Sequence, residues 1–352
     1  METFRIDVPQ RDLDDLHDRL DRTRWPADFP DEDWDYGVPG RHVRELAEYW
    51  RHGYDWRRTE ARLNAYPQFR TVIDGQRIHF AHVRSARPDA LPLILTHGWP
   101  GSIAEFLDVI EPLSRDFHLV VPSLPGFGFS GPTRERGWNV TRIAHAFAEL
   151  MRRLGYDRFG AAGNDWGSTI SPELARIAPD SVVGVHVTQL WTEATEKVAD
   201  PTPEEQAALD NHAWLAEHLN AYAVVQSQQP QSLAYALTDS PVGLLGWHCL
   251  IYRDGVDADY VLDNVSIHWL TGTAGSAIRI YLESSRQTPP NGQGGVVPLG
   301  YAQFRDDYQP IRRLTPPNVV RWNKYDTGGH FAAHQTPDLL VKDLTEFFAD
   351  LK

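Results

Sequence analysis

The sequence has 352 residues, enough for one large domain with an insertion or for two domains, and its hydrophobic content of 41% supports a sizeable core. A formal net charge of −14 argues against nucleic acid and anionic membranes as partners, and a single cysteine, Cys249, excludes an intramolecular disulfide. The N-terminal residues contain neither the apolar region of a signal peptide nor a membrane-spanning stretch, which favours a cytoplasmic protein. The composition does not indicate an oligomeric state.

The N-terminal region has a helical pattern. Leu13, Leu16 and Leu20 are spaced as on one face of a helix, which predicts an amphipathic helix over residues 10–22. A second helix is predicted at about residues 40–52. Four tryptophans accompany these segments and are expected to pack against the rest of the chain: Trp25, Trp34, Trp50 and Trp56.

Short apolar runs separated by helix-like segments begin near residue 69, a pattern typical of a mostly parallel sheet. The predicted strands are residues 69–73, 78–83, 93–96, 119–122, 159–163, 182–188, 296–299 and 319–322. Between about 195 and 290 the strand pattern stops and the sequence becomes helical, which predicts a cap over the carboxyl edge of the sheet, where ligands bind in such folds. A closing amphipathic helix is predicted at residues 337–351, capped by Thr336.

The segment Gly163-Asn164-Asp165-Trp166-Gly167 lies between a predicted strand and a helix-like stretch. Small residues on either side of a nucleophile at such a junction are typical of the nucleophile elbow of the α/β-hydrolase fold, because the turn is sharp. The central residue is an aspartate and not the serine of an esterase. A carboxylate is ionised near pH 7 and can displace a leaving group from an sp³ carbon, which forms an ester on the enzyme. This chemistry suits epoxides and alkyl halides rather than esters or amides.

Two further segments fit this interpretation in chain order. An apolar run precedes His97-Gly98-Trp99-Pro100, which is similar to the oxyanion loop of the fold. The backbone N–H groups of Trp99 and Trp166 would then hold a tetrahedral oxyanion. Near the C-terminus, Gly328-Gly329-His330 follows another predicted strand, and this histidine suits a general base. Each segment alone also occurs in ordinary turns, whereas the three together favour a hydrolase whose remaining carboxylate lies between nucleophile and histidine.

These motifs and several others make the chain similar to epoxide hydrolases of the microsomal type, over almost its whole length. The matching segments are residues 4–9, 20–26, 97–102, 125–130, 165–167, 239–243 and 328–333. The resemblance implies an α/β-hydrolase fold with a mostly parallel sheet, a helical cap insertion and an N-terminal extension. We expect the extension, wrapping core and cap, at residues 1–68, the core at 69–194 and 291–352, and the cap at 195–290. The implied partners are a small-molecule epoxide and water, with no cofactor and no metal.

The same resemblance implies the triad. Asp165 is the expected nucleophile and His330 the base that activates water. For the third member we choose Asp307, because residues 297–307 are similar to the strand and loop that end in an acidic residue in this family. The adjacent Asp306 is the rival.

The resemblance also implies two proton donors in the cap, Tyr222 and Tyr281. A phenol stays protonated at neutral pH and can hydrogen-bond to the epoxide oxygen as negative charge develops there. Three other tyrosines of the cap, Tyr235, Tyr252 and Tyr260, are expected to be packing residues.

Tryptophans are expected to line an apolar substrate pocket that suits an aromatic group. Besides the two at the oxyanion site, the candidates are Trp191, Trp247 and Trp269. Two alternative functions share many of these features. A haloalkane dehalogenase has the same fold and an aspartate nucleophile but does not need the two tyrosines, and a hydrolase-like ligand-binding protein would be expected to lose a member of the triad.

Overall fold

The computed structural model describes residues 1–27, 33–192, 198–253, 255–287 and 297–351. Its strands form one sheet in the order β1-β2-β3-β5-β4-β6-β7-β8-β9. The strands are β1 (Glu2–Phe4), β2 (Gln68–Ile73), β3 (Gln76–Val83), β4 (Leu91–Thr96), β5 (Phe117–Pro122), β6 (Phe159–Gly163), β7 (Val182–Val187), β8 (Leu299–Gln303) and β9 (Val319–Lys324). Neighbours from β5 to β9 are parallel, and β1, β2 and β3 extend one edge in antiparallel fashion. The mostly parallel sheet expected of an α/β-hydrolase is confirmed.

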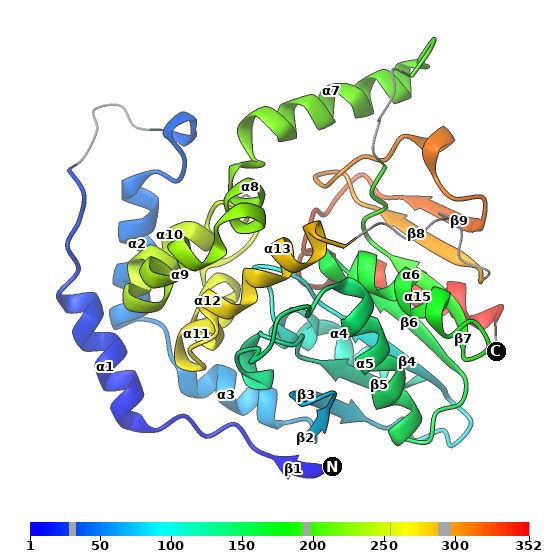
Figure 1. Cartoon of the computed structure of the whole chain (residues 1–352), viewed down its shortest axis with the longest axis horizontal. Helices are drawn as coiled ribbons and strands as arrows, with labels where there is room; N and C mark the ends of the chain where they lie inside the picture. Colours follow the sequence, from blue (N-terminus) through cyan, green and yellow to red (C-terminus); the bar gives the residue numbers. More distant parts are fainter. Residues whose placement is uncertain (28–32, 193–197, 254, 288–296, 352) are drawn as a thin grey trace.

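Helices form an N-terminal group, a core group and a cap group (Figure 1). The N-terminal helices are α1 (Gln10–Asp21), α2 (Gly40–His52) and α3 (Trp56–Asn64), with the 3₁₀ turn η1 (Trp34–Tyr36). The core helices are α4 (Leu107–Leu113), α5 (Val140–Arg153), α6 (Trp166–Ile177), α14 (Ala332–Gln335) and α15 (Pro337–Ala349), with the 3₁₀ turns η2 (Ile103–Phe106), η3 (Gly128–Ser130) and η4 (Arg312–Leu314). The cap helices are α7 (Pro203–His218), α8 (Ala221–Gln228), α9 (Pro230–Asp239), α10 (Pro241–His248), α11 (Ala258–Leu270), α12 (Ala274–Ala277) and α13 (Arg279–Ser285).

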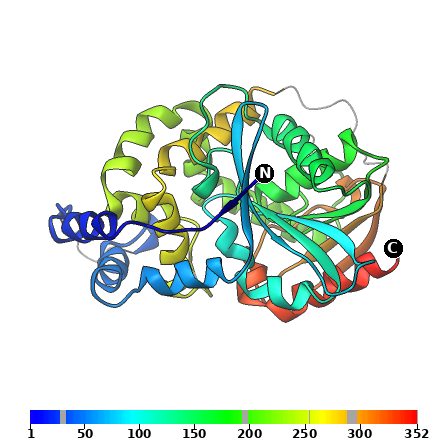
Figure 2. The same cartoon turned by 90° about the horizontal axis from the view of Figure 1, so that it is seen from below.

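The sheet is buried between two helical layers (Figure 2). Successive side chains of a strand point to opposite faces. In β4, Ile94 belongs to the apolar cluster that includes α5 and α6, whereas Leu93 and Leu95 belong to the cluster that includes α4 and α15. Because both faces are covered, the central strands β4 and β6 are almost entirely apolar, and polar side chains follow them at their carboxyl ends.

The N-terminal helices lie beside the cap in both views (Figures 1 and 2). In α2, Trp50 is 1% exposed and its indole N–H donates to Ser266 of α11 at 2.9 Å. The Tyr54 hydroxyl donates to Asp263 of the same helix at 2.8 Å. The extension is therefore fastened to the cap by buried polar contacts as well as by apolar packing. No helix in the described ranges is long and apolar enough to cross a bilayer.

Three local expectations were wrong or incomplete. The sequence pattern missed β1 and α3, which are three and nine residues long. The strand expected at 296–299 begins at Leu299 and continues to Gln303, and Val296 lies outside the described residues. Gly300 obscured this strand; it is needed because a Cβ there would lie 2.8 Å from the ring of Phe347 in α15.

The N-terminus of α15 also differs from expectation. Thr336 occupies the N-cap position, but its side chain makes no capping hydrogen bond. Its hydroxyl instead donates to the carbonyl of Ala332, in the short helix α14 that directly precedes it. The expected cap boundaries at residues 195 and 290 lie outside the described residues.

Candidate active site

The segment after β6 makes a sharp turn that projects Asp165 at the carboxyl edge of the sheet. Asp165 has φ +53° and ψ −118°, a left-handed conformation that is strained for a residue other than glycine. A Cβ at Gly163 would overlap the carbonyl of Gly167, and one at Gly167 would overlap the carbonyl of Thr96. The small residues on both sides of the aspartate are therefore required by the backbone.

Asp165, His330 and Asp307 lie together, from three separate parts of the chain. His330 Nε2 is 3.5 Å from Asp165 Oδ2, and His330 Nδ1 is 3.0 Å from Asp307 Oδ1. The same Asp307 oxygen accepts the backbone N–H of Tyr308 at 2.7 Å. The structure leaves Asp306 out of this group: its side chain is exposed and pairs with Arg305 at 3.0 Å.

Electrostatics favour a charged imidazole at this position. Burial alone would lower the pKa of His330, but the carboxylates of Asp307 and Asp165 outweigh that effect and hold its pKa well above the usual value. The positively charged form of the imidazole is therefore favoured between these two side chains.

The segment predicted to be the oxyanion loop follows β4 and reaches Asp165 directly. The backbone N–H of Trp99 donates to Asp165 Oδ1 at 2.8 Å. A Cβ at Gly98 would overlap that same oxygen, so glycine is required for this close approach. Trp166 is the first residue of α6, where backbone N–H groups have no acceptor within the helix. Both predicted donors thus lie next to Asp165 in the chain or in space.

Tyr222 of α8 and Tyr281 of α13 also come together, with ring centroids 6.0 Å apart. Tyr222 stacks on Trp99 at 5.2 Å, and Tyr281 meets the edge of Trp166 at 4.8 Å. Burial is the main cause that raises the pKa of both phenols. For Tyr222 the next cause is the charge of Asp165, and for Tyr281 the next causes are Tyr222 and then Asp165. Both hydroxyls therefore stay protonated at neutral pH in the electrostatic field of Asp165.

The structure describes ring and hydrogen-bond contacts for the three tryptophans predicted to line the pocket. None of these contacts is with Asp165, His330 or the two tyrosines. Trp191 is 45% exposed and packs on Tyr308. Trp247 donates to Gln226 at 2.9 Å within the cap. Trp269 lies under the guanidinium of Arg19 from α1. Their place in a substrate pocket stays a prediction.

Gln189, just beyond β7, is a site residue that the sequence interpretation missed. Its Oε1 accepts the backbone N–H of Asp165 at 2.6 Å, and its Nε2 donates to Asp307 Oδ2. One amide thus fixes the elbow and the acid relative to each other. The available signal was its position at the carboxyl end of a parallel strand that neighbours the strand before Asp165.

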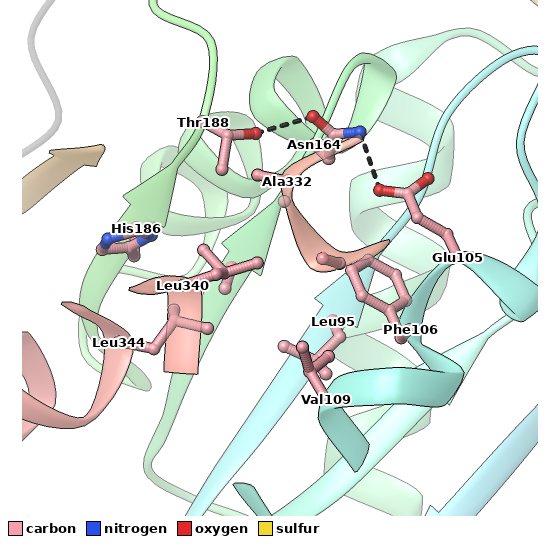
Figure 3. A pocket seen from close by; sticks show the side chains of 13 residues that line it. Leu95, Glu105, Phe106, Val109, Asn164, His186, Thr188, Ala332, Leu340 and Leu344 are labelled. Carbon is pink, nitrogen blue, oxygen red and sulfur yellow. Dashed lines mark hydrogen bonds between the residues drawn. The ribbon is translucent and has the colours of Figure 1, made fainter. Parts of the chain in front are cut away.

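Glu105 of η2 was missed as well. It is buried, and Asn164, the residue before Asp165, donates to its Oε1 at 2.7 Å. Burial raises the pKa of this carboxyl to about 8. Figure 3 shows the two hydrogen bonds that link Thr188 to Asn164 and Asn164 to Glu105. They lie beside a cavity of about 20 Å³ with mostly apolar walls.

In the described part of the chain, no three His, Cys, Asp or Glu side chains are grouped so that they could hold a metal ion.

Comparison with known proteins identifies the family of the chain. The family model described as "Epoxide hydrolase N terminus" matches residues 1–106, and that for the alpha/beta hydrolase fold matches residues 92–231. A protein of Stigmatella aurantiaca that is named as an epoxide hydrolase is 42% identical over 377 aligned positions, covering 99% of this chain and 85% of that protein. Epoxide hydrolase 1 of Sus scrofa is 30% identical, covering 99% of this chain and 88% of that protein.

Solved structures show the same relationship. The Aspergillus niger epoxide hydrolase superposes with a TM-score of 0.91 at 30% identity, covering 100% of this chain and 96% of that chain. The juvenile hormone epoxide hydrolase of the silkworm Bombyx mori gives a TM-score of 0.89 at 27% identity, covering 99% and 94%. The likeness extends through sheet, cap and N-terminal extension, and the chain therefore belongs to the epoxide hydrolase family, a family of enzymes with the α/β-hydrolase fold.

Proposed function

We propose that this chain converts an apolar epoxide, aromatic or otherwise bulky, into a vicinal diol through a covalent ester on Asp165. The observation that carries the proposal is the arrangement around this carboxylate. Trp99 N–H binds Oδ1 at 2.8 Å, and His330 Nε2 lies 3.5 Å from Oδ2. The phenols of Tyr222 and Tyr281 share its electrostatic field. A nucleophile flanked by a base and two acids has the groups that both half-reactions require.

In the first half-reaction, Oδ2 of Asp165 attacks an epoxide carbon while Oδ1 keeps its hydrogen bond to Trp99. The ring carbon–oxygen bond breaks, and the oxygen takes a proton from Tyr222 or Tyr281. Esterification removes the Asp165 charge, one of the two that raise the pKa of His330. The imidazolium then loses one proton. The phenolate needs one proton to become a phenol again, so the two changes balance.

In the second half-reaction, neutral His330 takes a proton from water, whose oxygen bonds to the ester carbonyl carbon of Asp165. Negative charge develops on Oδ1, where the N–H groups of Trp99 and Trp166 are the stabilising donors. The tetrahedral intermediate breaks its bond to the alkyl oxygen, which takes the proton back from the imidazolium. The diol leaves, and the new carboxylic acid passes its remaining proton to His330. This restores the carboxylate, with one oxygen from water, and the imidazolium with which the cycle began.

The aromatic surroundings support an apolar substrate. The rings of Trp99, Trp166, Tyr222 and Tyr281 contact one another near the nucleophile. Rings of this kind favour an apolar or aromatic substituent, while the two hydroxyls are the polar groups that orient the epoxide oxygen.

Two measurements test the proposal. The purified chain should convert styrene oxide to the diol and release no bromide from a bromoalkane; bromide release without diol would indicate a dehalogenase, and neither product would indicate a binding protein. A single turnover in ¹⁸O-water with enzyme in excess should give unlabelled diol, because the new oxygen comes from Asp165. Label in the first-turnover diol would mean direct attack by water and would exclude the ester.

A further inference from the structure

The carboxyl of Glu105 lies behind the nucleophile with one oxygen unused. Glu105 is 1% exposed, and its Oε1 accepts from Asn164. Its Oε2 is buried and has no hydrogen-bond partner among the residues that the structure describes. A Cβ at Gly101 would lie 2.8 Å from this oxygen, so the glycine of the oxyanion loop keeps the space beside it open.

Two tyrosine hydroxyls are likewise buried without a hydrogen-bond partner in the described part of the chain. The hydroxyls of Tyr252 and Tyr260 are buried and also lack a partner within the described ranges, although the side chains are only 1% and 5% exposed. Their rings are 5.9 Å apart, and both pack on Phe331, the residue after His330. After burial, the Glu105 charge is the largest cause that raises the pKa of both phenols. The three groups therefore lie in one buried region on the His330 side of the nucleophile.

Such groups indicate bound water. A buried polar atom without a partner is unfavourable, and buried polar atoms that lack protein partners usually bind ordered water. His330 Nε2 belongs to the same set, because its contact with Asp165 is a loose 3.5 Å and it has no hydrogen-bond partner in the described part of the chain. The charge of His330 also acts on the pKa of Glu105, which places the imidazole near the same region.

We propose that Glu105 is a positioning residue for ester hydrolysis, and that its carboxylate, supported by the hydroxyls of Tyr252 and Tyr260, holds the water that His330 activates. One hydrogen of that water points to His330 Nε2 and the other to Glu105 Oε2. The lone pair of the water oxygen is then directed at the carbonyl carbon of the Asp165 ester. This inference rests on the proposed function and assigns the group that orients its second step.

The ionisation state of Glu105 gives the proposal a distinctive pH dependence. A protonated carboxyl would donate to the water oxygen and compete with attack, whereas a carboxylate accepts from the water and leaves the lone pair free. Burial raises the pKa of Glu105 to about 8, and charged His330 lowers it while the Asp165 charge raises it. The carboxylate form grows as pH rises through that value. Hydrolysis of the ester should therefore accelerate with pH in this range, and Glu105→Gln should abolish that acceleration.

The experiment separates the two half-reactions in the full-length chain. Styrene oxide is mixed rapidly with excess enzyme, and acid-quenched samples are analysed by mass for the alkylated Asp165 peptide. In Glu105→Gln, alkylation should stay within about threefold of wild type while hydrolysis of the ester slows by roughly 10- to 100-fold. Glu173→Gln is the matched control, since Glu173 is also a buried glutamate but is bonded to Arg176 outside the site. It should change neither rate.

Several outcomes would overturn the proposal. Unchanged hydrolysis with an unchanged pH profile in Glu105→Gln would remove the role of the carboxylate. An equal loss in alkylation and hydrolysis would make Glu105 a merely structural residue. If that variant does not fold, Tyr252→Phe is the second test, because it removes one hydroxyl; it should slow hydrolysis alone, and wild-type hydrolysis would contradict the water site. Absence of any ester in the wild-type chain would instead contradict the proposed function itself.

Discussion

The imidazole of His330 is bonded to Asp307, with Nδ1 3.0 Å from Oδ1. This contact holds the ring with Nε2 towards the nucleophile and stabilises its positive charge. We expect Asp307→Asn to slow ester hydrolysis by about 10²- to 10⁴-fold and alkylation much less, because an amide neither stabilises the imidazolium nor fixes the tautomer. Rapid-quench measurement of both rates tests this.

The neighbouring aspartate provides a matched control. Asp306→Asn changes the adjacent carboxylate in the same way, but its side chain is exposed and pairs with Arg305. We expect both rates to stay near wild type. The reverse ranking of the two variants would transfer the role of acid to Asp306.

Replacement of the base should trap the intermediate. His330→Gln removes the group that takes a proton from water but leaves Asp165 and the cap tyrosines in place. We expect the peptide that contains Asp165 to gain the mass of one styrene oxide and to keep it for many times the wild-type turnover time. Normal turnover, or a folded variant that is never alkylated, would contradict the assignment.

The charge of His330 offers a test without substrate. The carboxylates of Asp307 and Asp165 raise its pKa against the effect of burial. Removing one of them by Asp165→Asn must weaken that effect, so the pKa of His330 should fall. A ¹⁵N NMR titration of imidazole nitrogens in both proteins measures this change directly. An equal or higher pKa in Asp165→Asn would mean that the two side chains do not interact as charges.

The sequence was most informative where local sterics allow few residue types. The elbow was predictable because its backbone tolerates only small residues at Gly163 and Gly167. Asp307 and its rival Asp306 were harder to separate, since adjacent residues differ only in the direction that a loop gives to each side chain. The fold class and the family membership predicted from such motifs are confirmed.

Gln189 and Glu105 were not predictable in the same way. Each acts through contacts with segments far away in the chain, Gln189 with Asp165 and Asp307 and Glu105 with Asn164. No motif with a known spacing contains them. A buried glutamate is also rare enough that, without the surrounding structure, an exposed position is the better expectation.

Trp50 should contribute strongly to the stability of the protein, because it attaches the N-terminal extension to the cap. Trp50 fills space between α2 and the cap, is 1% exposed, and donates to Ser266. Trp50→Ala should therefore lower the free energy of unfolding by about 3–5 kcal/mol. Trp214→Ala is the matched control: this side chain is 47% exposed on α7, and its removal should change stability by about 0.5 kcal/mol or less. Urea denaturation of the three proteins checks the ranking, and equal losses would contradict the described packing.

The two cap phenols decide between epoxide and halide chemistry. A halide leaves with only a hydrogen bond, whereas an epoxide oxygen must gain a proton or nearly so, and a positioned general acid contributes about 10²- to 10⁴-fold. Because Tyr222 and Tyr281 lie together, each partly replaces the other, and the losses should not be additive. We expect each Phe variant to slow alkylation of Asp165 about 10- to 100-fold, or about 1.4–2.7 kcal/mol.

The double variant is the decisive case. Tyr222→Phe with Tyr281→Phe loses two hydroxyls but keeps both rings and their contacts with Trp99 and Trp166, so it should fold and yet be nearly inactive towards epoxides. Tyr235→Phe, in which the altered side chain is exposed, is the control and should react normally. Quenching of tryptophan fluorescence on alkylation reports the rate, since Trp166 adjoins the nucleophile. Alkylation of the double variant at the wild-type rate would make both tyrosines packing residues, and the proton would then have to come from another group.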